Sequence, residues 1–123
     1  MRERWRLDGS DAVLNGDQAV DLVRTRLTAR QFGTTFCSDA GRFIGMVSNG
    51  RRMMCCVMSD DSDLHVVDPT AGDGSSGGFI LDNGQADEYA DRDTVDIERG
   101  LQRLRHFIDT GRTDPEDGWV VDR

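Results

Sequence analysis

The chain of 123 residues contains no lysine, and each of its 15 basic residues is arginine. It has only two histidines and three cysteines. Without lysine the chain cannot form a Walker-type loop, in which a lysine contacts the nucleotide phosphates. A structural zinc site needs CxxC-like spacing or a histidine cluster, and the sequence has neither. These absences predict a protein without a bound metal or cofactor.

Long hydrophobic runs are also missing. The longest strongly apolar stretch, Met53–Met58, is far too short to span a bilayer. Residues 1–6 carry charge with no apolar run behind them, so they do not resemble a secretory signal. Cys55 and Cys56 are adjacent and the number of cysteines is odd, which indicates reduced, buried thiols. We therefore expect a cytoplasmic protein that does not contact a membrane.

Positive charge is in the minority, because the 15 basic residues are outnumbered by 23 acidic ones and the net charge is −8 at pH 7. Nucleic-acid phosphates are bound through Lys and Arg, so we expect no direct binding of nucleic acid. A basic protein partner, in contrast, would be attracted and steered into contact. Charge alone favours a simpler explanation, which is that it keeps the protein soluble.

Two segments have the apolar periodicity of amphipathic helices. The first begins at a cap, either Asn15 or Asp17, and ends near residues 32–33. The second covers residues 94–110, with its first residue, a threonine, as the N-cap, and Gly111 ends it. The length of the chain suits one domain with one hydrophobic core.

The remaining apolar segments are short and predict strands. Asn49-Gly50 predicts a type I′ hairpin turn, which needs a positive φ at both central residues. The run Met53–Met58 shows no alternation, which predicts a central strand covered on both faces. We expect an α+β fold: an antiparallel β-sheet of about five to seven strands with two α-helices packed on one face. Seven segments have the pattern of strands and residues 2–7 are a possible edge strand. The seven are residues 34–37, 42–48, 52–58, 64–67, 79–81, 85–89 and 119–121.

Few residues are candidates for catalysis. His106 lies near the apolar stripe of the second helix, and His65 alternates with apolar residues in a strand. A nucleophile pair of His65 with Cys37 or Cys55 is conceivable, but a cysteine in an apolar strand is usually inert. The flexible loop 68–78 has glycines spaced as in a dinucleotide fingerprint, although a strand and not a helix follows it. We expect no enzyme. The alternative is a small-molecule-binding or enzymatic α+β domain that uses His65 and this loop.

Residues 78–119 carry the most distinctive pattern. They read GFILDNGQADEYADRDTVDIERGLQRLRHFIDTGRTDPEDGW. A strand leads into the Asn83-Gly84 turn, an acidic strand ends at Tyr89, and an amphipathic helix is followed by Gly111 and a terminal Trp119. This pattern, over about the last third of the chain, resembles the Imm1 family of bacterial immunity proteins.

The resemblance implies a single immunity domain over residues 1–123 that is not an enzyme. Proteins of this family occur beside polymorphic toxins, often of the nucleic-acid deaminase superfamily, and they bind and block the toxin domain. The implied partner is a basic toxin domain encoded immediately upstream and held in a 1:1 complex. An acidic surface suits such a partner, because the basic groove of the toxin normally receives phosphates.

Acidic residues in the loop before residue 64 and on or beside the hairpin are the candidates for this contact. They are Asp60, Asp61, Asp63, Asp82, Asp87, Glu88, Asp91 and Asp93. The residues that carry the family pattern are also explained by turns and packing. They are Asn83, Gly84, Tyr89, Gly111 and Trp119. A third interpretation makes the chain a subunit of an unrelated assembly, with Trp5 or Trp119 at the contact.

Overall fold

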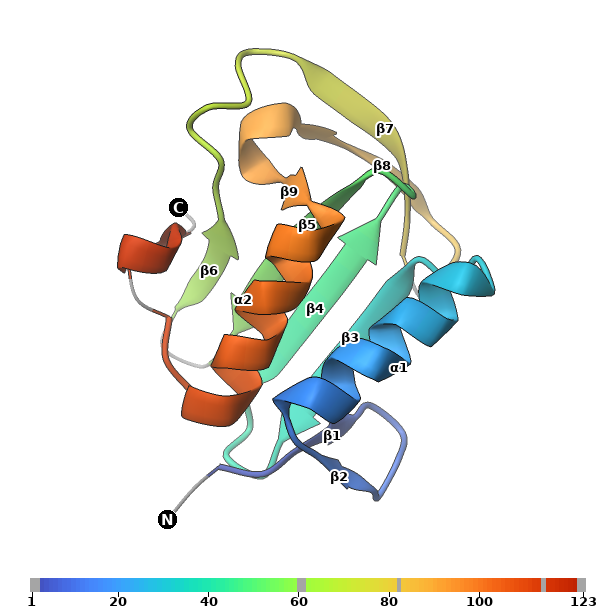
Figure 1. Cartoon of the computed structure of the whole chain (residues 1–123), viewed down its shortest axis with the longest axis vertical. Coiled ribbons are helices and arrows are strands. Elements are labelled where there is room, and N and C mark those ends of the chain that lie inside the picture. Colours follow the sequence, from blue (N-terminus) through green and yellow to red (C-terminus); the bar gives the residue numbers. More distant parts are fainter. Residues whose placement is uncertain (1–2, 60–61, 82, 114, 122–123) are drawn as a thin grey trace.

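The computed structural model describes residues 3–59, 62–81, 83–113 and 115–121. Within these ranges the chain forms an antiparallel sheet of eight strands, a separate two-stranded hairpin and two α-helices, which lie together on one face of the large sheet (Figure 1). The elements are β1 (Trp5–Leu7), β2 (Val13–Leu14), α1 (Gly16–Thr28), β3 (Gly33–Ser38), β4 (Phe43–Ser48), β5 (Arg52–Met58), β6 (Asp63–Val66), β7 (Ser75–Ile80), β8 (Ala86–Ala90), β9 (Val95–Asp96), α2 (Ile97–Thr110) and β10 (Trp119–Val121), with 3₁₀ turns η1 (Asp91–Asp93) and η2 (Pro115–Asp117).

The strand order of the large sheet is β10-β6-β5-β4-β3-β1-β2, and β9 pairs with the start of β5. The α+β class and the helices on one face are as the sequence predicts. The sheet has more than the expected five to seven strands because β2 and β9 are pairings of two residues each, too short for a period of two to reveal. Neither described helix has the length and apolarity that crossing a membrane requires.

Helix α1 begins as predicted and ends earlier than predicted. Asn15 Oδ1 accepts the Gln18 N–H at 2.8 Å and Gln18 Oε1 accepts the Asn15 N–H at 2.9 Å, which is a complete capping box. The helix stops at Thr28, before the predicted end at residues 32–33. Arg30 has a φ of 61° and takes the left-handed position that glycine usually fills in a helix-ending motif. A non-glycine residue there gives no signal in the sequence.

The sequence predicts that α2 begins just after Thr94, but the helix begins at Ile97. Asp96 is the N-cap, and its carboxylate accepts the Arg99 N–H at 2.8 Å. Thr94 is fully buried, and its hydroxyl donates to Asp91 O at 2.9 Å. The predicted cap is wrong because residues 95–96 pair with β5 before the helix can start. Gly111, with a φ of 71°, ends the helix as predicted.

The core lies between the helices and the sheet and contains both tryptophans. Trp5 and Trp119 are 1% and 3% exposed. The ring of Phe107 on α2 lies 5.0 Å from the ring of Trp5 and 6.0 Å from that of Trp119, measured between centroids. Neither tryptophan is therefore available for a contact with another subunit, whereas packing accounts for both.

Strand β5 is fully covered on one face and only partly on the other, which corrects the prediction of coverage on both. Its helix-facing side chains, such as Met53 and Cys55, are 1% exposed. On the other face Met54 and Cys56 are half-buried and Met58 is 38% exposed. The missing alternation in the sequence thus reflects apolar side chains on a face that the protein itself covers only in part.

Two local predictions need correction as well. The turn between β4 and β5 is not type I′, which needs a positive φ at both Asn49 and Gly50. Gly50 has a φ of 91°, but the only non-glycine residue with a positive φ in the described chain is Arg30, so Asn49 does not have one. Asn49 Oδ1 holds this turn by accepting the backbone N–H groups of Arg51 and Arg52 at 2.9 and 2.8 Å. Part of the expected flexible loop 68–78 is in fact the strand β7.

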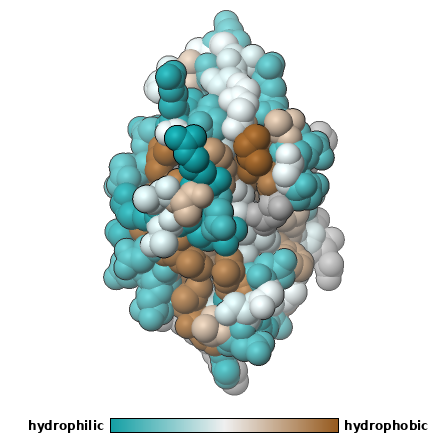
Figure 2. All heavy atoms as spheres, turned by 90° about the vertical axis from the view of Figure 1, so that its right-hand side faces the viewer, coloured by the Kyte–Doolittle hydropathy of each residue, from teal (hydrophilic) through white to brown (hydrophobic). Residues whose placement is uncertain are grey.

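One side of the molecule is mostly hydrophilic (Figure 2). Figure 2 shows the side of the molecule that is at the right in Figure 1, and hydrophobic residues appear there in separate places among hydrophilic ones. This agrees with a charged fraction of 31%. The larger exposed hydrophobic side chains of the described residues include Phe43 and Met58, which are neighbours on the sheet face away from the helices.

Candidate functional site

The sheet face opposite the helices carries a groove of about 340 Å³. Its floor is a row of apolar side chains on β5, Met54, Cys56 and Met58, which alternate with the buried side chains of that strand. One wall comes from β6 and the other from the end of β8 and the turn η1. The wall residues are Asp63, His65, Tyr89 and Asp93.

A second groove of about 320 Å³ adjoins the first and has the same three floor residues. It extends across β4 and β3 and is bounded by Leu81 and Asn83 at the tip of the β7–β8 hairpin. A Cβ atom on Gly45 would lie 3.2 Å from the Cys56 sulfur, so the glycine leaves room for this thiol. The two grooves together cross the sheet from β6 to β3.

The register of the strands extends the apolar floor from β5 onto the start of β4. Phe43 lies opposite Met58, and Met58 lies opposite Asp63. Phe43 and Met58 are 39% and 38% exposed, which is high for large apolar side chains that are adjacent on one face. The floor is therefore an apolar strip that ends at a carboxylate.

The β6 wall and the η1 wall are connected by a polar contact. His65 Nε2 lies 3.1 Å from Asp93 Oδ1, and the two side chains are 21% and 42% exposed. Asp63 is exposed at the start of β6 and lies on the same side of the groove as His65. Two carboxylates and one imidazole therefore line an otherwise apolar depression.

Tyr89 is fixed by contacts with the hairpin. Its ring packs edge-on against Phe79, which is fully buried, with 4.9 Å between centroids. Its hydroxyl donates a hydrogen bond of 3.0 Å to Asp87 Oδ2. Burial, together with the Asp87 carboxylate, raises the pKa of Tyr89 to about 12. The phenol therefore stays neutral at physiological pH and presents part of its ring to the groove.

Two adjacent residues of β7 join the hairpin to other segments. Asn49 Nδ2, in the β4–β5 turn, donates to Gly77 O at 3.1 Å. The Ser76 hydroxyl donates to Asp91 Oδ1 in the turn η1 at 2.6 Å. The position of Tyr89 relative to the floor of the groove is thus set by contacts that are far apart in the sequence.

The structure brings together only some of the predicted acidic residues. Asp63 and Asp93 line the groove, and Asp87 lies behind Tyr89 as its hydrogen-bond acceptor. Glu88 is on the opposite face of β8 and accepts a hydrogen bond from Ser75. Asp91 accepts from Ser76 and so has a structural role. Asp60, Asp61 and Asp82 lie outside the described residues.

The residues of the family pattern have structural roles. Gly84, with a φ of 86°, completes the hairpin turn, and Asn83 Oδ1 accepts the Gln85 N–H there at 2.9 Å. Gly111 ends α2, and Trp119 is in the core. Tyr89 has a structural role, because it packs on the hairpin, and it also lines the groove.

The fold does not bring together the nucleophile pairs considered from the sequence. Cys37 is on β3, and β4 and β5 separate it from His65 on β6. Cys55 is buried under the helices, and this burial raises the pKa of its thiol. Cys56 is the cysteine that lies opposite His65 in the β5–β6 ladder. No residue of the loop 68–78 lines the groove that contains His65. Among the described residues, no group of three His, Cys, Asp or Glu side chains could hold a metal ion.

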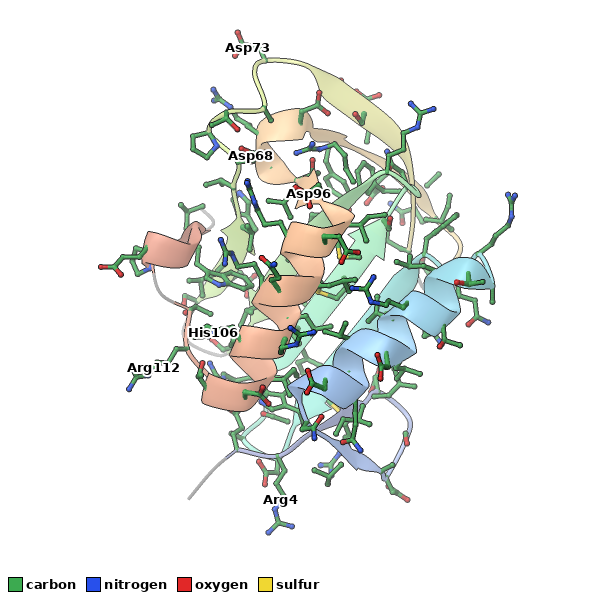
Figure 3. All side chains as sticks on the ribbon, in the orientation of Figure 1. Arg4, Asp68, Asp73, Asp96, His106 and Arg112 are labelled. Carbon is green, nitrogen blue, oxygen red and sulfur yellow. The ribbon has the colours of Figure 1, made fainter. Side chains whose placement is uncertain are left out.

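A buried polar centre around Asp68 holds the connection between β8 and α2. Asp68 is 7% exposed; its carboxylate lies 3.4 Å from a terminal nitrogen of Arg52 and 3.7 Å from one of Arg99. The Thr70 hydroxyl donates to Asp68 at 2.6 Å and, with Arg52, lowers the pKa of this carboxyl. Figure 3 shows Asp68 and Asp96 near the start of α2, whereas Asp73 points away from the molecule.

The apolar floor is the part of the site that sequence reasoning missed. Its signal was present in the sequence, because the run Met53–Met58 is apolar without alternation. The chain matches no family model, no curated protein and no solved structure.

Proposed function

We propose that the protein is an immunity protein that binds a cognate toxin domain and neutralises it by covering its basic substrate cleft. The observation that carries this proposal is the partly exposed apolar floor on β5 with carboxylates on its walls. An apolar centre with a polar rim is the usual anatomy of a specific protein interface. The net charge of −8 favours a basic partner.

The class of toxin follows from the resemblance of residues 78–119 to bacterial immunity proteins. We propose a toxin that acts on nucleic acid, of the deaminase type, because such an enzyme needs a basic cleft for phosphates. The apolar floor would provide most of the binding energy, and the acidic walls would set the association rate and its salt dependence. The proposed complex contains one copy of each protein and is cytoplasmic.

Co-expression with the protein encoded immediately upstream tests the proposal. We expect rescue of growth and a tight 1:1 complex in a pull-down. A folded protein that neither rescues growth nor binds the upstream product would overturn the proposal.

A second function is supported by one observation, the 3.1 Å contact of His65 with Asp93 inside the groove. A small-molecule-binding or enzymatic domain would use this imidazole as an acid or base. The variant His65→Ala distinguishes the two functions. An inhibitor keeps its protective effect in this variant, because the floor and Asp63 remain, whereas an enzyme loses its activity.

A further inference from the structure

We propose that the groove recognises an arginine side chain of the partner, with the guanidinium between Asp63 and Asp93 and the aliphatic stem along Met54 and Met58. This inference rests on the proposed function, because it names the group that the same site receives. It follows from the composition and arrangement of the walls and floor of the groove.

The floor suits an unbranched apolar stem. Met54 and Met58 are on one face of β5, with Cys56 between them, and they form a strip of side chains along the strand. Methionine side chains are flexible and polarisable, so they adapt to a narrow chain that lies on them. An arginine stem has three methylene groups that pack on such a surface while its charged head reaches the rim.

The walls of the groove suit a planar cation. Asp63 and Asp93 approach from different walls, and Tyr89 presents its ring beside them. A guanidinium donates hydrogen bonds in several directions in one plane and stacks on aromatic rings, whereas an ammonium is a compact point charge. The pKa of Tyr89, at about 12, keeps the ring uncharged. Two acceptors and a neutral ring around one apolar strip therefore favour arginine over lysine.

The side chain of His65 already occupies one position near Asp93. That contact uses Oδ1 of the carboxylate, and the side chain of Asp93 is still 42% exposed. Asp63 is exposed at the start of β6. An arriving cation can therefore reach both carboxylates without removing a buried ion pair.

The test uses the free protein with ¹³C-methyl-labelled methionine and three capped tripeptides, Ac-Leu-Arg-Leu-NH₂, Ac-Leu-Lys-Leu-NH₂ and Ac-Leu-citrulline-Leu-NH₂. Met54 and Met58 report on the groove, while Met46 and Met53, each 1% exposed under the helices, report on the fold. We expect the arginine peptide to shift the two groove methyl signals in a saturable way and to leave the two core signals unchanged. The lysine peptide should bind at least about threefold more weakly, and the neutral citrulline peptide should give no saturable shift.

Variants at the walls complete the test. Asp63→Asn and Asp93→Asn should each weaken binding of the arginine peptide by about fivefold or more, with the Met46 and Met53 signals as proof that the fold is intact. Equal shifts with arginine and citrulline, or binding unaffected by both substitutions, would overturn the inference. A partner complex that leaves the Met54 and Met58 signals unchanged would overturn it while the proposed function stands. Arginine binding without any toxin complex would leave the groove assignment intact and overturn the proposed function.

Discussion

Asp109, near the end of α2, accepts a hydrogen bond of 2.8 Å from the backbone N–H of Gly16, the first residue of α1. One helix thus supplies the acceptor for a free N–H group at the start of the other. The contact is close, because a Cβ atom on Gly16 would lie 2.6 Å from both Arg105 O and Asp109 Oδ2. This junction fixes the helix pair that covers one face of the sheet.

We expect Gly16→Ala to lower the free energy of unfolding by about 1–3 kcal/mol, since backbone atoms of α2 must move to accept the methyl group. Urea unfolding followed by circular dichroism measures the change. Gly77→Ala is the matched control, because a Cβ atom at that exposed strand position would meet nothing closer than 4.0 Å. An equal loss in both variants would contradict the close approach of the two helices.

Asp68 should make stability depend on pH in the acid range. Its pKa in the folded protein is below the ordinary value of 3.8, so the folded state favours the ionised form. The stabilisation is therefore present above the unfolded-state pKa and is lost as the pH falls through the folded-state pKa. We expect Asp68→Asn to be less stable at pH 7 by about 1–3 kcal/mol and to lose less stability than the wild type between about pH 5 and about pH 2.

Urea midpoints at several pH values measure this effect. Asp73→Asn is the control, because the side chain of Asp73 is fully exposed. If the wild type and Asp68→Asn lose stability in parallel on acidification, the role given to the Asp68 centre is wrong.

The three thiols should react at different rates. Cys55 is buried and burial raises its pKa, so we expect it to react with a thiol reagent only when the protein unfolds. Cys37 and Cys56 are half-buried and should react in the folded protein. Single Cys→Ser variants followed by mass spectrometry assign each rate. Bound partner should protect Cys56, which lines the groove, and protection of Cys37 alone would place the contact elsewhere.

The elements that could be predicted are those whose signal is local. The capping box at Asn15, the apolar stripe of α2 and the glycine at position 111 are all read from neighbouring residues. The two errors in the helix ends have different causes. Thr94 does not cap α2 because it is buried beside Arg52 of β5, which is distant in the sequence. Helix α1 ends early because Arg30 adopts a positive φ, which a non-glycine residue does not reveal in the sequence.

The candidate site was only partly predictable as well. The sequence identifies Asp63 and Asp93 as acidic candidates. That both line the same groove depends on where the fold places β6 and η1. Asp87 and Glu88 are adjacent in sequence and point to opposite faces of β8, so a patch inferred from sequence proximity combined residues that the strand separates. The apolar floor was visible as a run, yet its exposure depends on what covers the sheet.

The most direct test of the account is the association rate with the upstream-encoded toxin domain, measured by stopped flow over a range of salt concentrations. We compare the double variant Asp63→Arg, Asp93→Arg with the double variant Asp73→Arg, Glu116→Arg, which has the same change in net charge at positions that line neither groove. We predict that the groove variant associates about tenfold or more slowly at low salt and loses most of its salt dependence, while the control changes by less than about threefold. Equal rates for the two variants would contradict the claim that this groove receives the toxin.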